Sequence, residues 1–431
     1  MLTNDAKIIK CIARQILDSR GSATIEVEIT AKLNGEEISA KAAVPSGKST
    51  GSEEAYEMRD ADGGVLQVIE SVEKKIAPEI LNQPLDSEQI DHLMLTLDTT
   101  RNKKNIGANA MLGVSMAVIR LEAKVRKMPL WKIISEKSRF PVGKPKLYMN
   151  TLNGGAHADF CLPFQEYILA VSGETLAGAN EKAQAVFQKV KNKLDEKNIS
   201  YYTGDEGGLA PRLETLDEPF QILTDCIGDD PDIFIAIDAA ASEFYDEKSG
   251  TYEILGNKYD RANLILIYDE LVKKFNLRSI EDPFDEKDFP GFLQIVKFLG
   301  ESALVIGDDL TVTNPLLVKK YGERKCATGI IIKPNQIGTI LETFEAIREA
   351  RSFGWKIVVS HRSGETMDSF IADLAVGVGA FAIKAGAHTQ PERKAKYDRL
   401  VEIEKEMIQD EIAEKIKKEE ADKARWREIN S

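Results

Sequence analysis

Six short runs in the second half of the chain decide the fold: DIFIAID (232–238), LRSIE (277–281), ALVIGD (303–308), TGIIIK (328–333), KIVVSH (356–361) and FAIK (381–384). Each run is mainly apolar and ends in a charged or polar residue, and successive ends lie 23 to 43 residues apart. A strand, a helix and two loops need about that length. The pattern therefore predicts βα units with buried parallel strands.

Two earlier apolar runs complete the predicted sheet. KLYMN (146–150) and EYILAV (166–171) bring the number of strands to eight. Eight strands over this length favour the α/β class and a closed, TIM-like barrel, whose chemistry lies at the C-terminal ends of its strands. One charged strand end is common in any protein, but six in series favour a functional site.

The stretch RFPVGKPK (139–146), rich in Pro, Gly and Lys, is the best domain boundary. We therefore expect a smaller N-terminal α+β domain over residues 1–139 and the barrel over residues 140–431. Apolar residues at three- and four-residue spacing predict helices over 108–126 and, near the end of the chain, over 399–418.

A β-hairpin is predicted near the start of the chain. Residues 23–30 alternate apolar and polar side chains, and Asn34-Gly35 offers a tight turn into residues 36–44.

Charge and composition exclude several classes of function. The chain has 431 residues and a formal charge of −13, so most of its surface would repel nucleic acid. No apolar run approaches the roughly 18 residues of a membrane span. The start MLTNDAKIIK lacks a signal peptide's apolar stretch, and the four cysteines are far apart, so we expect a cytoplasmic protein with reduced thiols.

Two motifs resemble nucleotide-binding loops and are rejected. Ser46-Gly-Lys-Ser-Thr50 ends like a P-loop, but position 42, where that motif needs glycine, is alanine. A small flexible loop over an active site is the better interpretation of this stretch. Residues 377–382 imitate a dinucleotide fingerprint but follow a helix pattern instead of a strand.

Three acids at consecutive strand ends suggest a metal site. Asp238, Glu281 and Asp308 have no sulfur or histidine among them, and all-oxygen ligation suits a hard ion such as Mg²⁺. The alternative is that they pair with nearby Lys or Arg. The neighbouring Asp282 and Asp309 are better candidates for such structural pairing.

Basic side chains meet at the same mouth. Lys333 and Lys384 end two strands, and a basic role for either would need nearby cations or desolvation to depress its pKa. Arg362 and Ser363 offer a grip for a phosphate or a carboxylate. Taken alone, the two lysines could simply neutralise carboxylates, and Glu206 and His157, both on glycine-rich loops, are weak signals.

Together these segments resemble the enolase family. The matching motifs run in order through nearly the whole chain: DSRG (18–21), VPSG (44–47), EAYEMRD (54–60), NGG (153–155), GDEGG (204–208), SIEDPF (279–284), GDDLTVTNP (307–315), KPNQIGT (333–339), SHRSGET (360–366) and FIADL (370–374).

The resemblance implies a barrel whose first units run ββαα and a Mg²⁺-dependent, reversible dehydration of 2-phosphoglycerate to phosphoenolpyruvate. It implies that Lys333 is the base that removes the C2 proton and Glu206 the acid that assists loss of the C3 hydroxyl. It implies a first Mg²⁺ on Asp238, Glu281 and Asp308, and a second, substrate-dependent one near Ser49. The substrate-binding residues would be His157, Glu166, His361, Arg362, Ser363 and Lys384.

The chain also departs from the family pattern. After Lys384 the usual Pro-Ala-Arg core is replaced within residues 386–393, and Asp159-Phe160 stands where Gly-Asn is common. Glu392 and Arg14 match a pair that bridges subunits in the family, so a homodimer or a higher homo-oligomer is expected. Two alternatives stay open: a divergent paralogue acting on another carboxylate, and an inactive binding or scaffold protein.

Overall fold

The computed structural model describes residues 5–47 and 51–429. Their N-terminal part is a three-stranded antiparallel sheet, β1 (Lys7–Leu17), β2 (Ala23–Leu33) and β3 (Glu36–Ala43), in that order. The predicted hairpin is confirmed, because Asn34 and Gly35 between β2 and β3 both have positive φ, as a two-residue turn of this kind requires. Strand β1 was not predicted, since its Lys7, Lys10 and Arg14 interrupt the apolar alternation.

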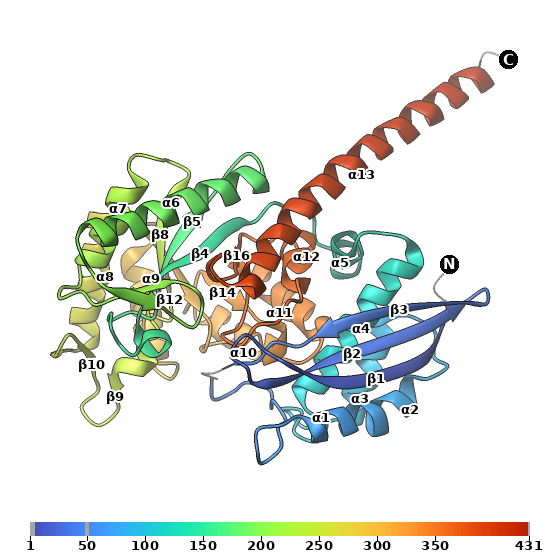
Figure 1. The fold of residues 1–431 in the computed structure, drawn as a ribbon, viewed down its shortest axis with the longest axis horizontal. Helices are drawn as coiled ribbons and strands as arrows, with labels where there is room; N and C mark the ends of the chain where they lie inside the picture. The colour runs from blue at the N-terminus through green and yellow to red at the C-terminus, as the bar shows by residue number, and fades with distance from the viewer. Residues whose placement is uncertain (1–4, 48–50, 430–431) are drawn as a thin grey trace.

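Helices pack on this sheet and extend the N-terminal part (Figure 1). The predicted helix over 108–126 is confirmed as α4 (Ala108–Arg126), which packs on β2 and β3. The other helical segments are α1 (Leu66–Glu70), the π-helical turn Ser71–Ile76, α2 (Ala77–Ile80), α3 (Ser87–Leu97) and α5 (Leu130–Ser138).

The second part is a closed barrel of eight strands, as predicted. Strand β16 pairs with β4 and closes the ring. In ring order the strands are β4 (Lys146–Asn153), β5 (Glu166–Val171), β8 (Ile233–Asp238), β12 (Leu277–Glu281), β13 (Leu304–Gly307), β14 (Gly329–Ile332), β15 (Lys356–Ser360) and β16 (Ala382–Lys384).

One strand of the barrel runs against the others. Strand β5 is antiparallel to both β4 and β8. The prediction that all barrel strands are parallel is therefore wrong for β5. The ββαα start implied by the family resemblance is confirmed, because two helices, α6 (Leu176–Glu196) and α7 (Glu218–Ile227), follow β5 before the chain enters β8. The strand pair β6 (Tyr201–Thr203) and β7 (Leu209–Pro211) lies between those helices.

The remaining elements surround the barrel. The helices are α8 (Arg261–Phe275), α9 (Phe289–Leu299), α10 (Pro315–Glu323), α11 (Ile340–Ser352) and α12 (Phe370–Gly377), and a small sheet comprises β9 (Tyr245–Asp246), β10 (Thr251–Ile254) and β11 (Asn257–Tyr259). Alternate strand residues, among them Tyr148, Ile168, Ile306, Ile331 and Val358, form a separate buried cluster, which is the filled interior expected of such barrels.

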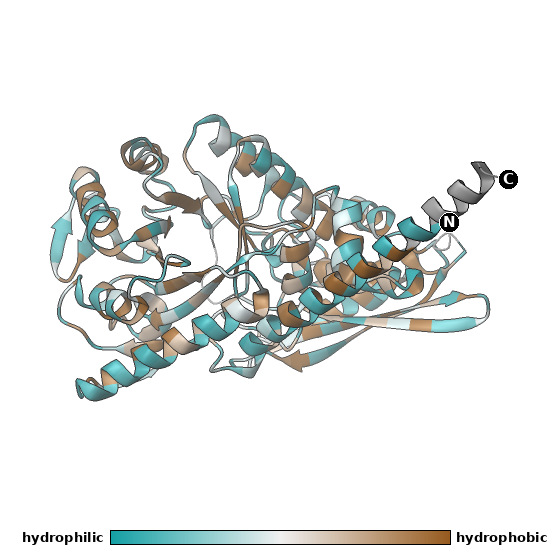
Figure 2. Cartoon of the chain, turned by 90° about the horizontal axis from the view of Figure 1, so that it is seen from above, coloured by the Kyte–Doolittle hydropathy of each residue, from teal (hydrophilic) through white to brown (hydrophobic). Residues whose placement is uncertain are grey.

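The C-terminal helix is longer than predicted. Helix α13 spans Pro391–Ile429, compared with a predicted 399–418, and its outer half projects from the body (Figure 1). Lys, Glu and Ala have high helix propensity, which favours continuation of the helix through the charged end of the chain. Figure 2 shows hydrophilic and hydrophobic residues interleaved along it, and Ile408, Ile412 and Ile416 are exposed.

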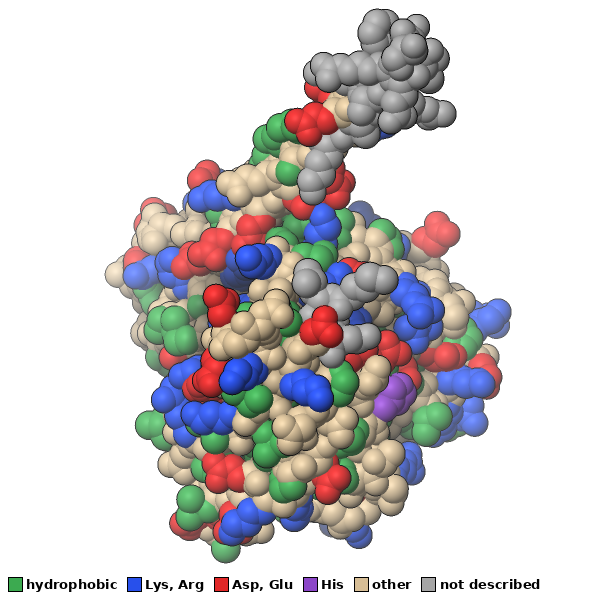
Figure 3. Space-filling view, turned by 90° about the vertical axis from the view of Figure 1, so that its right-hand side faces the viewer, with side chains coloured by type: hydrophobic (Ala, Val, Ile, Leu, Met, Phe, Trp, Pro, Cys, Tyr) green, Lys and Arg blue, Asp and Glu red, His purple; other side chains and the backbone are tan. Residues whose placement is uncertain are grey.

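Two surface features bear on the class of protein. On the face drawn in Figure 3, basic and acidic side chains intermingle instead of gathering into one basic area. Among the described residues, none of the helices combines the length and the apolar character that crossing a membrane requires.

A partly buried ion pair joins the N-terminal part to the barrel. Arg120 of α4 donates to both carboxylate oxygens of Asp368, which also accepts the backbone N–H groups of Ala43 and Phe370. Burial disfavours the charge of Asp368, but Arg120 and these hydrogen bonds overcome that effect and hold the pKa of Asp368 below its ordinary value. The contribution of this pair to stability is therefore present above about pH 4 and lost as the pH falls through the lowered pKa.

We predict that Arg120→Met lowers the free energy of unfolding by about 3–5 kcal/mol at pH 7, because it leaves the Asp368 charge buried without its partner. The loss should be smaller at pH 4, where Asp368 takes up a proton more readily in the variant. The double variant Arg120→Met/Asp368→Asn should recover part of the stability at pH 7. Urea unfolding of the three proteins at both pH values measures this, and an unchanged unfolding free energy in Arg120→Met would contradict it.

Candidate functional site

The charged strand ends meet in one pocket at the C-terminal mouth of the barrel. Its volume is about 50 Å³, and its lining includes Glu54, His157, Glu166, Glu206, Asp238, Asp308, Lys333, His361, Arg362, Ser363 and Lys384. Glu281 is not part of the lining but contacts Lys384 beside it. Of the residues predicted for the site, Ser49 alone lies outside the described residues.

Two lysines compensate the strand-end carboxylates. The Nζ atom of Lys384 lies 3.1 Å from Glu166 Oε2, 3.1 Å from Asp238 Oδ2 and 2.9 Å from Glu281 Oε2. Lys333, directly after β14, pairs with Asp308. The structure thus brings the three predicted metal ligands into one network, in which lysine ammonium groups stand between them.

The pKa values of the groups in this network are shifted in different directions. Burial, together with repulsion from Asp238, raises the pKa of Glu281 well above its ordinary value. Burial opposes the charge of Asp308 as well, but contact with Lys333 holds its pKa below the ordinary value. Burial likewise disfavours the ammonium of Lys333, but Asp308 outweighs that and raises its pKa. Lys333 is therefore protonated while this ion pair persists.

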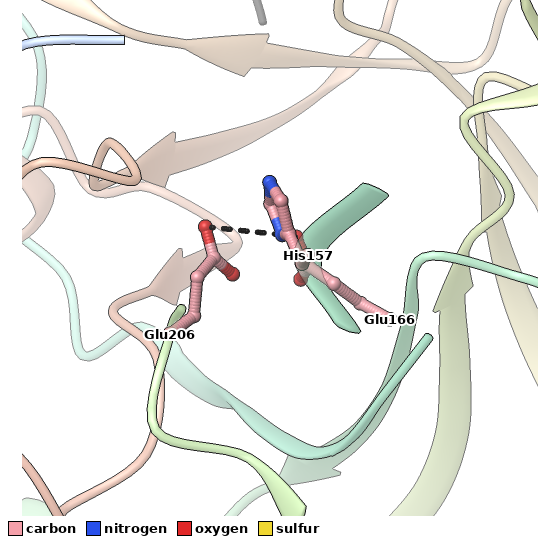
Figure 4. Close-up of side chains that lie close together, drawn as sticks. All are labelled: His157, Glu166 and Glu206. Carbon is pink, nitrogen blue, oxygen red and sulfur yellow. Dashed lines mark ion pairs between the residues drawn. The ribbon is translucent and has the colours of Figure 1, made fainter. Parts of the chain in front are cut away.

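A second cluster lies on the other side of the pocket, where His157 approaches two glutamates (Figure 4). Its Nδ1 atom lies 3.9 Å from Glu166 Oε1 and 3.8 Å from Glu206 Oε1. Burial and the nearby Glu206 raise the pKa of Glu166, whereas His361 and His157 overcome burial and lower the pKa of Glu206. A proton shared by the two glutamates would therefore favour Glu166 over Glu206.

Burial and a contact with Arg393 keep the His361 ring neutral. Burial lowers its pKa to about 4, and the guanidinium of the fully buried Arg393 donates to its Nδ1. Because Nδ1 accepts, the proton of the neutral ring lies on Nε2, which faces Glu206 Oε2 at 3.4 Å. Arg393 also donates to the backbone oxygens of Arg362 and Ser363, so the altered segment 386–393 still supports this loop.

Arg362 is held by the N-terminal part. Its guanidinium lies 3.0 Å from Glu54 Oε2 and donates to Asn335 Oδ1, while the hydroxyl of Ser363 accepts from Arg20. A Cβ atom on Gly47 would lie 1.9 Å from the Arg362 guanidinium, so a side chain at this position would displace the guanidinium from its present place. Gly47, the last described residue of the predicted active-site loop before residue 48, therefore lies beside Arg362 of the pocket.

One prediction about the acids is wrong. Asp282 and Asp309 do not pair with Lys or Arg among the described residues. Asp282 accepts the backbone N–H groups of Asp308 and Asp309, and these three carboxylates have oxygens within 4.8 Å of one another. Burial and repulsion from Asp308 raise the pKa of Asp309 to about 8. The turn after β13 brings these acids together, which no spacing in the sequence indicated.

Several polar residues of the site escaped sequence reasoning. Asn150 donates to Glu206, Gln165 lines the pocket, and Gln336 donates to Asp308 and Glu54. These residues carry no charge, and the sequence around each of them contains no feature that indicates a functional site. The motif matches at EAYEMRD and KPNQIGT were the signals that could have drawn attention to Glu54, Asn335 and Gln336.

The residues present suit a hard divalent cation. Asp238, Glu281 and Asp308 offer only oxygen atoms, all buried at one mouth, and two ammonium groups already lie where positive charge is needed. The buried Oε1 atom of Gln165 lacks a hydrogen-bond partner among the described residues.

Comparison with known proteins gives the family. The family model described as "Enolase, C-terminal TIM barrel domain" matches residues 141–421, and "Enolase, N-terminal domain" matches residues 8–134. Proteins named enolase from Thermococcus gammatolerans and Methanococcus vannielii are each 42% identical to the chain, covering 94% of it and 96% and 97% of their own lengths. The enolase of Methanopyrus kandleri is 43% identical, covering 93% of the chain and 96% of its own length. The chain therefore belongs to the enolase family.

Proposed function

We propose that the chain is a phosphopyruvate hydratase, a hydro-lyase that converts 2-phosphoglycerate reversibly to phosphoenolpyruvate. The observation that carries the proposal is the composition of one buried pocket. It combines two lysines, a glutamate–histidine cluster and an arginine–serine pair at the ends of different strands. Near full-length similarity to proteins named enolase supports the same activity.

Lys333 is the proposed base. A proton beside an ionised carboxylate is weakly acidic, because its removal adds negative charge to the same group. Lys333 can accept that proton only after it gives up its ion pair with Asp308 and loses its own proton. Arg362 and Lys384, both of which lower the pKa of Lys333, then favour its neutral form.

A divalent cation on Asp238, Glu281 and Asp308 would stabilise the charge that develops on the substrate carboxylate. We propose Mg²⁺ at this position and a second, substrate-dependent Mg²⁺ near Ser49. Lys384, among Glu166, Asp238 and Glu281, would hold the carboxylate end of the substrate in place.

Glu206 is the proposed acid for the departing C3 hydroxyl. The lowered pKa of Glu206 disfavours its acid form, so it would receive the proton from the neighbouring Glu166, whose pKa is raised. His157 lies 3.8–3.9 Å from oxygens of the two glutamates, and the Nε2 atom of His361 lies 3.4 Å from Glu206, so both would have to move closer to donate a hydrogen bond. These contacts would allow the proton to move within the cluster to the leaving oxygen.

Arg362 and Ser363 would bind the phosphate. In the structure Glu54 occupies the guanidinium, and the pocket of about 50 Å³ is small against the roughly 300–1,000 Å³ of ordinary ligand pockets. Substrate binding therefore requires Glu54 to release Arg362 and the N-terminal loop to move. The phosphate would then replace the carboxylate of Glu54 on the same guanidinium.

The remaining expectations are proposals as well. We propose an N-terminal domain over residues 1–139, a barrel domain over residues 140–431, a homodimer in which Arg14 and Glu392 contact the partner subunit, and a cytoplasmic location without a nucleic-acid partner. Within the chain Arg14 pairs with Glu26, yet most of its side chain is exposed and accessible to another subunit.

The purified chain should form phosphoenolpyruvate from 2-phosphoglycerate in the presence of Mg²⁺ and lose this activity in excess chelator. The ultraviolet absorbance of the product measures both. No turnover with Mg²⁺ would reject the proposal. It would leave a paralogue, which should turn over another carboxylate, or a binding protein, which should turn over none.

Lys333→Ala should lower kcat by at least about a thousandfold, because no other described lysine occupies the base position. Binding of 2-phosphoglycerate, measured by calorimetry with Mg²⁺, should change far less. Lys356→Ala, at the exposed start of the neighbouring strand β15, is the matched control and should keep normal activity. Full activity in Lys333→Ala would refute the assigned base.

Asp308→Asn should raise the Mg²⁺ concentration needed for half-maximal activity by about tenfold or more, because an amide is a weaker ligand than a carboxylate. Asp285→Asn, an acid near the same mouth but outside the pocket lining, should leave the requirement unchanged. Equal requirements in Asp308→Asn and the wild type, determined from Mg²⁺ titrations of initial rates, would exclude Asp308 as a ligand.

A further inference from the structure

The loop that carries Glu206 is bound along its backbone by a segment that follows β16. We call residues 204–208 the acid loop and residues 387–393, which include the start of α13, the support segment. Three of the five residues of the acid loop are glycines, so its own backbone has much conformational freedom. The backbone N–H of Ala387 donates to the carbonyl oxygen of Glu206 at 2.9 Å. A contact from outside the loop therefore holds it at the proposed acid itself.

Two side chains of the support segment bind the acid loop on either side of Glu206. The hydroxyl of Thr389 donates to the carbonyl oxygen of Gly207 at 2.7 Å, and the amide of Gln390 donates to that of Asp205 at 3.2 Å. With the backbone contact, they hold three consecutive carbonyl oxygens of the loop. Thr389 and Gln390 stand where the usual Pro-Ala-Arg core of the family is replaced, so both contacts belong to the altered part of the chain.

Arg393 joins the acid loop to the loop that carries His361, Arg362 and Ser363. Its side chain is completely buried. One terminal nitrogen of its guanidinium donates to His361 Nδ1 and to the carbonyl oxygen of Arg362. The other donates to the carbonyl oxygens of Ser363 and Asp205. A planar group with several fixed donors suits such a bridge, and one side chain thus ties together the two loops.

We propose that the support segment positions Glu206 for loss of the substrate hydroxyl through Thr389, Gln390 and Arg393, and that Arg393 sets the tautomer of the adjacent His361 ring. All three are positioning residues, because they act through the backbone of the acid loop and through His361. The inference rests on the proposed role of Glu206 as the acid of the hydratase reaction.

The support segment bears on only one of the two chemical steps. Lys333, the proposed base, follows β14 and pairs with Asp308, outside the contacts described above. Displacing the acid loop should therefore slow loss of the hydroxyl and leave removal of the C2 proton intact. A defect in folding or in substrate binding would slow both steps together.

The double variant Thr389→Val/Gln390→Leu tests this separation, because it removes two donors at positions that are not fully buried. It should form phosphoenolpyruvate about tenfold more slowly, with a nearly unchanged KM, yet still exchange the C2 hydrogen of 2-phosphoglycerate in D₂O. Thr389→Ser/Gln390→Leu, which restores a hydroxyl, should recover part of the lost rate.

Lys394→Gln is the matched control. Its side chain is exposed and pairs with Asp398 on the surface, so this variant should behave as the wild type in both assays. An equal loss of exchange and of product formation in Thr389→Val/Gln390→Leu, or no loss of either, would overturn the proposal.

Hydrogen–deuterium exchange of the chain without substrate separates this proposal from the proposed function. Peptides that cover residues 204–208 should exchange their amide hydrogens faster in Thr389→Val/Gln390→Leu than in the wild type, because the loop opens more easily without its donors. Equal exchange in the two proteins would overturn the support segment, whatever the activity. A wild type without turnover would instead reject the proposed function, and this measurement would still decide the support segment.

Nitrogen NMR of the histidine-labelled chain tests the role of Arg393. Burial, with the charge of Arg393, lowers the pKa of His361 to about 4 against the opposing effects of Glu206 and Glu365. The wild-type ring should therefore stay neutral with its proton on Nε2 between about pH 5 and 8. In Arg393→Met the ring should take up its second proton at higher pH, because the nearby positive charge is removed.

The signal of His361 is identified as the one that disappears in His361→Gln, and Lys394→Gln should leave it unchanged. An unaltered tautomer and titration in a folded Arg393→Met would overturn the role of Arg393. If Arg393→Met does not fold, Thr389→Val/Gln390→Leu decides the proposal alone.

Discussion

The buried ammonium of Lys384 is the interaction on which the catalytic half of the molecule depends. The barrel places Glu166, Asp238 and Glu281 on adjacent strands, so their charges meet out of contact with water. Such a group of carboxylates is stable only beside compensating cations. Lys384 forms ion pairs with all three carboxylates, and Lys333 forms an ion pair with Asp308. Three cations, Lys333, Arg362 and Lys384, thus stand among the acids of the pocket.

The same contacts set a condition on catalysis. Asp308 favours the protonated form of Lys333, and Glu54 occupies the guanidinium of Arg362, so the proposed base and the proposed phosphate-binding arginine are both held in ion pairs. Under the proposed function, binding of cation and substrate would exchange both ion pairs. The N-terminal part would then contribute to catalysis directly, because Glu54 and the glycine approach at Gly47 both belong to it.

The eight strands and their charged ends could be predicted because an apolar run that stops at a charge is a local pattern, and the structure places those ends in one pocket. The direction of β5 could not be predicted, because an apolar run such as EYILAV occurs in both parallel and antiparallel sheets. The hydrogen-bond partners of individual side chains were even harder to predict from the sequence. Nothing near Asp282 in sequence indicates that it accepts two backbone amides of the next strand's loop, and Arg393 reaches His361 across 32 residues. Long-range contacts of this kind follow from the closed ring and not from spacing.

The central claim is that one pocket separates proton removal from hydroxyl loss, with Lys333 serving the first step and Glu206 the second. Exchange of the C2 hydrogen of 2-phosphoglycerate in D₂O with Mg²⁺, followed by NMR, tests it most directly. The account predicts that Glu206→Gln still exchanges this hydrogen while forming almost no phosphoenolpyruvate, and that Lys333→Ala does neither. Exchange that persists in Lys333→Ala, or that disappears in a folded Glu206→Gln, would contradict the account.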